Sequence, residues 1–246
     1  MLIYRETNWK RESGFDIQKY RFTIGTISPS KVSKEQQTKI EKISLVAFLS
    51  EDQRKIFIKI CRRLKQNNKD FYQNKNLHAT LFGFGPKSKK DYQAITKQIQ
   101  LFTKSRKVTL TIKLDSIRPG SAYYGNRTLK PFKGLSNGTV IAIGDVSHNI
   151  EFSKYANCLT KYLLNNKSIK SILGKNFRRK FPTVWITLGY YNKKDNFKID
   201  TVLEDIFKQY KNLDKDYFSF AISEISLVKS KYKNLRYPKF IQKFQL

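Results

Sequence analysis

Two short stretches of the chain repeat each other and decide its fold: Leu77-His78-Ala79-Thr80-Leu81 and Val184-Trp185-Ile186-Thr187-Leu188. Each stretch lies in an apolar run that reads as a β-strand, over residues 77–84 and 183–191. Residues two apart on a strand share a face, so we expect one face of the first strand to carry His78, Thr80, Phe82 and Phe84. The matching row of the second strand is Trp185, Thr187, Gly189 and Tyr191.

The elements around the two stretches are repeated as well. The first half reads as a strand over 43–49, a helix opened by a capping box at 50–53, the first repeated strand, a helix over 92–102 and a strand over 108–114. The second half reads as a strand over 139–146, a helix over 152–163, the second repeated strand, a helix from 201 and a strand over 218–222 that slips in phase, as at a bulge. Each half is therefore β-α-β-α-β, and two such halves are expected to pack as one α+β domain.

This pattern predicts one bilobal domain with a polar extension before it. Residues 1–41 form the expected N-terminal extension, with one candidate strand at 20–26. The domain covers 42–246, in halves of about 42–118 and 139–246 that are joined by a loop over 119–138. Loops of this length are more often functional than idle. Tyr123 and Tyr124 in the loop are either a lid over the site or ordinary turn aromatics.

Charge is the strongest signal in the composition. The chain has 49 Lys+Arg against 19 Asp+Glu, a net charge of +30. A gene rich in A and T favours lysine codons, but this bias does not explain the imbalance, because acidic residues are not enriched together with lysine. Such a field attracts polyanions, so we expect an RNA partner, single-stranded or at RNA ends, with a small nucleotide as the alternative.

Several other classes of protein are not expected. The longest apolar run, residues 43–49, is too short to span a bilayer, and the N-terminus lacks the apolar stretch of a secretory signal. Cys61 and Cys158 lie far apart and read as reduced core residues of a cytoplasmic protein. We therefore expect a cytoplasmic monomer that needs no metal or other cofactor and does not bind membranes.

The chain resembles the 2H phosphoesterase superfamily. The resemblance lies in the motif His-x-Thr-apolar, which occurs in the same strand of each β-α-β-α-β half, with Trp in place of His in the second half. This superfamily includes the 2′-5′ RNA ligase-like and 2′,3′-cyclic phosphodiesterase proteins. The similarity runs from about Ile43 to Leu246 and includes a strand over 222–230. The resemblance implies a pseudo-two-fold bilobal fold in which two rows of motif residues face each other across a central cleft that holds a phosphate.

The resemblance also implies a chemistry and a set of site residues. One imidazole takes a proton from the attacking water or hydroxyl, and the other gives a proton to the leaving oxygen, without a metal. Carried over to this chain, His78 is the catalytic residue, and Thr80 and Thr187 are phosphate-binding residues.

The chain departs from the family at Trp185, which stands where the second histidine belongs. An indole offers one N–H donor and a stacking face, but it cannot accept a proton. Two functions therefore stay open. One is an RNA-facing phosphodiesterase or ligase-like enzyme, with weakened or lost catalysis, that acts on or holds a phosphodiester or a cyclic or terminal phosphate. The other is a non-catalytic module that binds single-stranded RNA or a nucleotide.

The remaining candidate residues are aromatic or basic. Trp185, Phe82 and Tyr191 either fill the core or form a platform on which bases stack. His148, the chain's other histidine, reads as a helix-start or surface residue, or else as the group that replaces the missing proton donor. Candidate phosphate contacts, with a solvated basic surface as the alternative reading, are Arg178, Arg179, Lys180, Lys229, Lys231 and Lys233.

Overall fold

The computed structural model describes residues 37–67, 71–119, 139–145, 147–174, 177, 184–190, 202–203, 205–206, 208–209, 218–232, 235 and 237–246. Several predicted features lie outside these residues: the extension up to residue 36 with its candidate strand, the joining loop with Tyr123 and Tyr124, Tyr191, and the basic residues Arg178, Arg179, Lys180 and Lys233.

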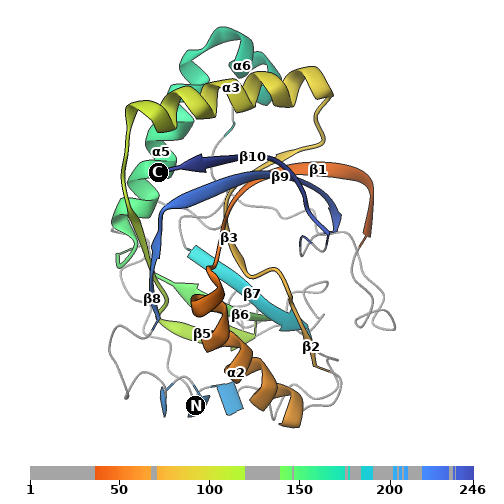
Figure 1. Cartoon of the computed structure of the whole chain (residues 1–246), viewed down its shortest axis with the longest axis vertical. Helices are drawn as coiled ribbons and strands as arrows, with labels where there is room; N and C mark the ends of the chain where they lie inside the picture. The colour runs from red at the N-terminus through yellow and green to blue at the C-terminus, as the bar shows by residue number, and fades with distance from the viewer. Residues whose placement is uncertain are drawn as a thin grey trace, which may run out of the picture.

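The elements follow the predicted order (Figure 1). The helices are α2 (Glu51–Asn67), α3 (Lys89–Ser105), α5 (Ile150–Asn165) and α6 (Lys167–Leu173). The strands are β1 (Gln37–Phe48), β2 (Tyr72–Gln73), β3 (His78–Gly85), β4 (Leu110–Lys113), β5 (Ser116–Pro119), β6 (Thr139–Gly144), β7 (Val184–Tyr190), β8 (Ser219–Ile222), β9 (Glu224–Tyr232) and β10 (Lys239–Gln245). The sequence did not predict β2, β5, β10 and α6. The capping box of α2 is present, since Ser50 Oγ accepts from the Gln53 N–H at 3.3 Å and Gln53 Oε1 accepts from the Ser50 N–H at 2.9 Å.

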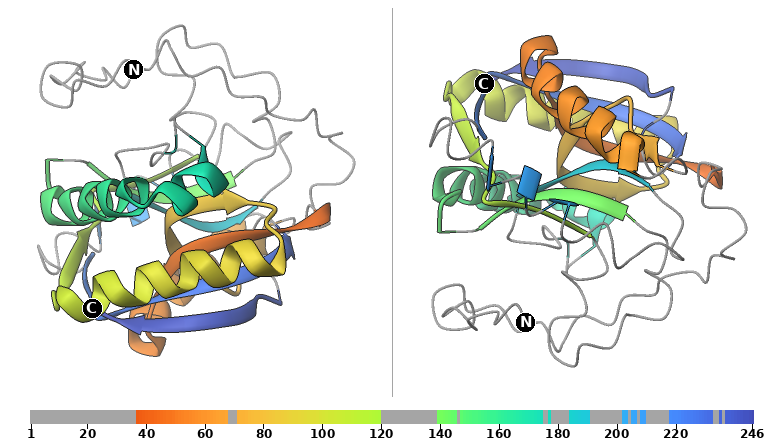
Figure 2. Two further views of the ribbon diagram at one scale, coloured as in Figure 1. Left: turned by 90° about the horizontal axis from the view of Figure 1, so that it is seen from above. Right: turned by 90° about the horizontal axis from the view of Figure 1, so that it is seen from below.

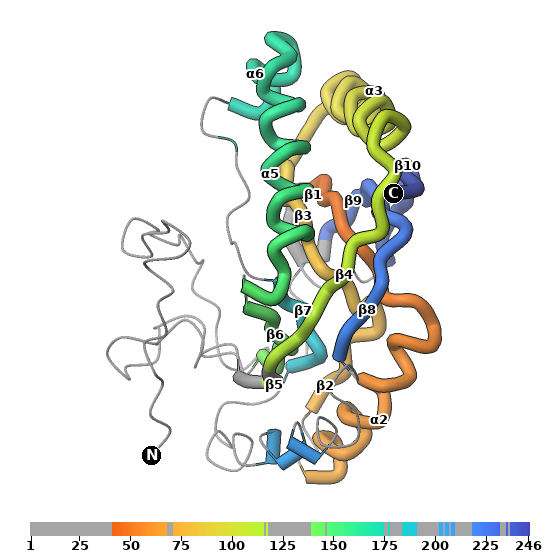
Figure 3. The backbone as a smooth tube through the Cα atoms, turned by 90° about the vertical axis from the view of Figure 1, so that its left-hand side faces the viewer, coloured from red at the N-terminus to blue at the C-terminus, as the bar shows by residue number. Residues whose placement is uncertain are grey.

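The strands form an eight-stranded sheet and a separate two-stranded ladder. The large sheet has the order β10-β9-β1-β3-β7-β6-β5, with β2 beside β7. The ladder joins β4 and β8, which run side by side in Figure 3. The two repeated strands, β3 and β7, are neighbours at the centre of the sheet, and the equivalent strands β4 and β8 pair with each other. This symmetry confirms the duplicated α+β fold.

The two halves of the sequence exchange strands. At the end of the first half the chain passes from β4 into β5, which pairs with β6 of the second half. At the end of the second half it passes from β8 into β9, which pairs with β1 of the first half. The phase slip after residue 222 is therefore a passage from the ladder into the large sheet. Neither half of the sequence contains all the strands on its own side of the sheet.

One face of the large sheet is covered by helices, and we call it the core face. Leu45 and Ala47 of β1, Ala79 of β3 and Ile186 of β7 are fully buried there against apolar side chains of α2, α3 and α5. Helices α3 and α5 lie side by side (Figure 2) and contact each other through the rings of Phe102 and Tyr155, 5.5 Å apart. Burial of each large apolar side chain contributes roughly 1.5–3 kcal/mol. Among the described residues, no helix has the length and apolarity that a membrane crossing requires.

Candidate functional site

The two repeated stretches meet at their centres. Ala79 of β3 pairs with Ile186 of β7 in antiparallel register, and both residues hold the second position of the repeated motif. An antiparallel pair that joins equivalent positions places the pseudo-two-fold axis between those two residues. Their side chains are buried on the core face, so the residues on either side of them point to the opposite face.

That opposite face carries His78, Thr80, Trp185 and Thr187, and we call it the motif face. In the antiparallel register His78 lies beside Thr187 and Thr80 lies beside Trp185, with Cβ atoms about 4.5–5.5 Å apart. His78 and Trp185 are diagonal neighbours at about 7–8 Å. The two rows therefore lie on neighbouring strands and on the same face of the sheet. Thr80 is exposed, and Trp185 and Thr187 are partly exposed.

Both motif strands contain a β-bulge at the same position. Successive residues of β1, Leu45 and Val46, pair with Phe82 and Thr80, so Leu81 has no partner in the ladder with β1. Successive residues of β6, Val140 and Ile141, pair with Gly189 and Thr187, so Leu188 likewise has no partner in the ladder with β6. An extra residue in a strand reverses the alternation of the residues after it. The fourth motif position is thus bulged in both copies, a structural mark of the duplication.

The first bulge overturns the prediction for Phe82. Because its β1 partner is Leu45, Phe82 points to the core face and is only 2% exposed. Its ring packs against Phe84 at 6.0 Å and against Phe177 at 5.5 Å. Phe82 is a core residue, and the prediction that it shares the face of His78 and stacks a base is wrong.

The second bulge has the same effect on the row after Thr187. Gly189 turns to the core face, where a Cβ atom would lie 2.4 Å from the ring of Phe71 and 2.5 Å from the carbonyl oxygen of Tyr72. Only glycine permits this approach to β2. Tyr190, which pairs with Thr139, takes the place on the motif face that the sequence assigned to Gly189 and Tyr191.

His78 is held in one orientation and one tautomer. The residue as a whole is 9% exposed, and Nδ1 lies 2.7 Å from the backbone carbonyl of Asn76. A carbonyl only accepts, so Nδ1 carries the proton and Nε2 presents a lone pair. Burial lowers the pKa of His78, and the hydrogen bond to Asn76 only partly offsets it. Burial therefore favours the neutral ring, in which Nε2 is the acceptor.

Asn74 links the two motifs, and nothing in the sequence pattern singled it out. Its side chain is buried, and its Nδ2–H₂ group donates to the carbonyl of Thr187 at 3.0 Å and to the carbonyl of Asn76 at 3.4 Å. Its backbone N–H donates to the bulged Leu188 carbonyl at 2.8 Å. The Asn76 carbonyl also orients His78, so one amide ties His78 of the first copy to Thr187 of the second.

We expect Asn74→Asp to disturb His78 without touching it. The substitution keeps the shape and the acceptor for the Asn76 N–H, but it removes both donors and turns a carboxylate oxygen toward two carbonyls. Stability should fall by about 1–3 kcal/mol in urea unfolding, and the His78 ¹⁵N signals should show a mixture of tautomers. Asn67→Asp, at an exposed asparagine of α2 that donates to Arg63, should change neither measurement. An unchanged His78 tautomer in a destabilised Asn74→Asp protein would contradict this role.

The described lysines of the predicted phosphate set lie away from His78. Lys229 pairs with Ile43 in the ladder of β9 and β1, so it lies on the core-face side of the sheet, at its margin. Its Nζ is 2.6 Å from Glu41 Oε2, and this hydrogen bond raises the pKa of Lys229. By strand alternation Lys231 is on the same side. The prediction that these two lysines contact a phosphate beside His78 is therefore wrong.

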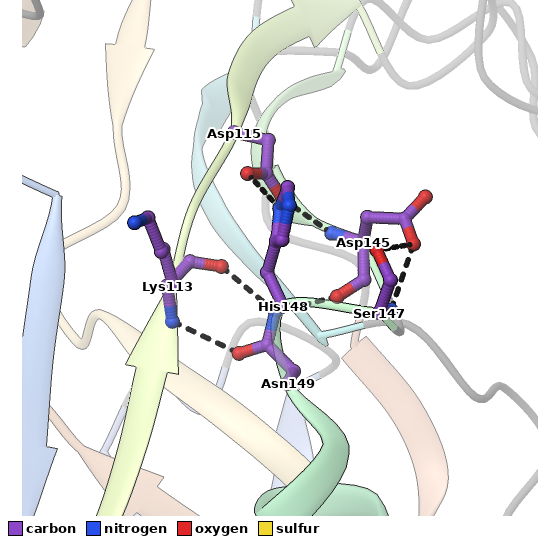
Figure 4. A network of polar contacts seen from close by, with 6 residues as sticks. All are labelled: Lys113, Asp115, Asp145, Ser147, His148 and Asn149. Carbon is purple, nitrogen blue, oxygen red and sulfur yellow. Dashed lines mark hydrogen bonds and ion pairs between the residues drawn. The ribbon is translucent and has the colours of Figure 1, made fainter.

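His148 belongs to a polar network at the start of α5 (Figure 4). Its Nδ1 lies 2.6 Å from Asp115 Oδ1, and its side chain is 53% exposed. The other carboxylate oxygen of Asp115 accepts from the Asp145 N–H at 2.6 Å. The buried Asn149 side chain, next in the chain, donates to the carbonyls of Lys113 and Asp145. His148 is thus the helix-start residue that the sequence predicted, bound to a carboxylate.

Comparisons with known proteins rest on structure alone. No family model matches the chain, and no curated protein matches it in sequence. Among solved structures, E. coli LigT complexed with 3′-AMP matches with a TM-score of 0.50 and 16% identity, over 87% of this chain and 99% of LigT. E. coli LigT complexed with NADP+ matches with a TM-score of 0.50 and 15% identity over the same shares. Kluyveromyces marxianus Usb1 matches with a TM-score of 0.50 and 9% identity, over 85% of this chain and 99% of Usb1.

These identities are low, so the matches establish a shared architecture and not a shared activity. The structures of LigT and Usb1 align with most of this chain, including both of its halves. The chain shares the fold of LigT and Usb1, and this fold agrees with the duplicated architecture that its resemblance to the 2H phosphoesterase superfamily implied.

Proposed function

We propose that the protein binds the phosphorylated ends of single-stranded RNA on its motif face, with a terminal or 2′,3′-cyclic phosphate between His78, Thr80 and Thr187. The observation that carries this proposal is the pairing of Ala79 with Ile186, which brings the two motif copies into contact around one small area. The net charge of +30 supports a polyanionic ligand. LigT, which shares the fold, has been captured with 3′-AMP.

The polar groups of the motif face suit a phosphate. The hydroxyls of Thr80 and Thr187 flank the pseudo-two-fold axis and can each donate to a phosphate oxygen. His78 Nε2, an acceptor while the ring is neutral, can take the proton of a water or ribose hydroxyl that attacks the phosphorus. A neutral ring also adds no positive charge, so phosphate affinity should depend on the hydroxyls and on the general field of the protein.

Trp185 limits the chemistry. In a cyclic phosphate the leaving ribose oxygen needs a proton, and the group diagonal to His78 is an indole that holds its N–H at every accessible pH. Loss of one such general acid removes about 10²–10⁴ in rate. We therefore propose slow phosphodiesterase activity at most. The same observation favours a second candidate, a module that holds RNA ends without cleaving them.

The test uses the fact that the chain contains only two histidines. With ¹⁵N-labelled histidine at pH 7, inorganic phosphate and a nucleoside 2′,3′-cyclic phosphate should shift the His78 ring signals. His148, bound to Asp115 at the start of α5, should stay unshifted. A salt titration should weaken the binding of an RNA oligonucleotide with a 3′-phosphate steeply, because counterions are released on binding.

Matched threonine variants locate the phosphate. Thr80→Val and Thr187→Val remove one hydroxyl each and should weaken phosphate binding by roughly five- to tenfold each. Thr111→Val, at an exposed strand position in β4, controls for the substitution itself and should have no effect. Phosphate that shifts His148 and leaves His78 unchanged would exclude the motif face as the site.

A further inference from the structure

A second aromatic surface lies beside His78, on the side away from Trp185. Of the aromatic side chains that the structure describes, Tyr237 and Phe240 are the two most exposed, at 69% and 54%. Phe240 pairs with Val228, whose β1 partner Ser44 is on the same side of the sheet as Val46 and Phe48. Phe240 and Phe48 therefore lie on the motif face, and Tyr237 comes three residues before Phe240 in the chain.

Ring contacts connect this surface to the imidazole. The ring of Phe48 lies 5.9 Å from the His78 ring and 5.5 Å from the Phe240 ring. Lys243 Nζ lies 5.7 Å from the centre of the Phe240 ring, close enough for a cation–π interaction. A continuous aromatic path thus runs from the buried His78 to the exposed Phe240 ring, which has the Lys243 ammonium group near it.

The chain before Phe240 is held in a strained conformation. Leu235 and Tyr237 both have a φ of 54°, in the left-handed region that residues with a side chain rarely adopt. Leu235 is anchored by its side chain, buried with Val46 and Val228, and by its carbonyl, which accepts from Asn76 Nδ2 at 2.7 Å. Asn76 is also the residue whose carbonyl orients His78.

From these observations we infer that Tyr237 and Phe240 form a nucleobase-binding subsite. It stacks the base or bases next to the phosphate that His78 contacts. This inference rests on the proposed function and specifies where the nucleoside part of the ligand lies. Exposed rings beside a cation are typical of the surfaces on which single-stranded nucleic acids stack their bases. Such stacking tolerates any sequence, because every base has a π-face. Asn76 joins the two parts, because its side chain binds the Leu235 carbonyl, two residues before Tyr237, and its own carbonyl binds His78.

The experiment compares two ligands on one set of variants. The ligands are an RNA pentanucleotide with a 3′-phosphate and an abasic ribose-phosphate pentamer with the same number of phosphates. Phe240→Leu and Tyr237→Leu keep apolar volume but remove the ring, and each should weaken binding of the RNA by about 5- to 150-fold. Both variants should bind the abasic pentamer within twofold of wild type. Phe240→Tyr, which keeps a ring, should bind the RNA as the wild type does.

The outcomes separate this inference from the proposed function. If RNA shifts the His78 signals but Phe240→Leu and Tyr237→Leu bind it as tightly as wild type, the base subsite is excluded and the phosphate site stands. If neither ligand nor inorganic phosphate shifts His78, the proposed function fails. If the leucine variants lose RNA and abasic pentamer equally, the rings support the phosphate site and do not stack bases. Ile150→Ala, at an exposed apolar residue of α5, should match the wild type throughout.

Discussion

Trp185→His should raise the rate at which the protein opens a 2′,3′-cyclic phosphate by about 10²–10⁴-fold over wild type. Trp185 holds the position that the pseudo-two-fold axis relates to His78, and it lies beside Thr80 as His78 lies beside Thr187. An imidazole there would supply the proton that the leaving oxygen lacks. The measurement is turnover of an oligonucleotide that ends in a cyclic phosphate, with folding monitored by thermal melting.

Two further variants separate a restored pair from other causes. His78→Ala/Trp185→His should lose the gain, because the two imidazoles act in opposite protonation states and neither replaces the other. Trp185→Phe, which keeps an aromatic ring without a proton to exchange, should be no faster than wild type. A well-folded Trp185→His protein that binds the oligonucleotide but gains no activity would show that the site lacks more than a second histidine. Wild-type turnover that survives His78→Ala would place the chemistry elsewhere.

Gly144→Ala should be the most destabilising small substitution in the described part of the sheet, at about 3 kcal/mol in urea unfolding. A Cβ atom at Gly144 would lie 2.0 Å from the backbone carbonyl oxygen of Lys113 and 2.6 Å from Nδ2 of Asn149. Neither atom can move alone, because Asn149 donates to that same carbonyl at 2.8 Å and accepts from the Lys113 N–H at 2.9 Å. The methyl group would therefore push β4 away from β6.

Gly83→Ala is the matched control, since it changes glycine to alanine within β3 where no atom lies within 4 Å of the added Cβ. Alanine lowers the conformational entropy of the unfolded chain. The free energy of unfolding of this variant should therefore equal that of wild type or exceed it by up to about 1 kcal/mol. Equal stability of the two variants would mean that β4 does not approach Gly144 as closely as described.

The sequence predicted the parts of this protein that depend on local pattern. The period-two strands, the capping box of α2 and the recurrence of His-x-Thr as Trp-x-Thr are all readable from neighbouring residues, and together they predicted the duplicated fold. The face on which each motif residue lies was predictable only as far as the fourth motif position. Beyond it, the bulges at Leu81 and Leu188 reversed the assignments of Phe82 and Gly189.

The errors share a physical cause. A bulge depends on how a strand registers with its partners, and the partners of β3 and β7 come from distant parts of the chain. The side of the sheet on which Lys229 lies likewise follows from the register of β9 with β1. Its ammonium group forms an ion pair with Glu41. Asn74 had no local signal at all, because its function in the fold is a contact with Thr187, far away in the sequence.

The exchange of strands between the halves bears on how the chain is made. In the finished sheet β1 is an interior strand, because β9 covers its outer edge. On the ribosome, however, β1 emerges well before β9, because most of the domain lies between them in the chain. Until β9 has been made, the nascent chain therefore offers a strand edge with unpaired N–H and C=O groups, the kind of surface through which chains pair with one another. Because lysine and arginine exceed the acidic residues in this chain, we expect neighbouring nascent chains to repel each other and this repulsion to oppose such pairing.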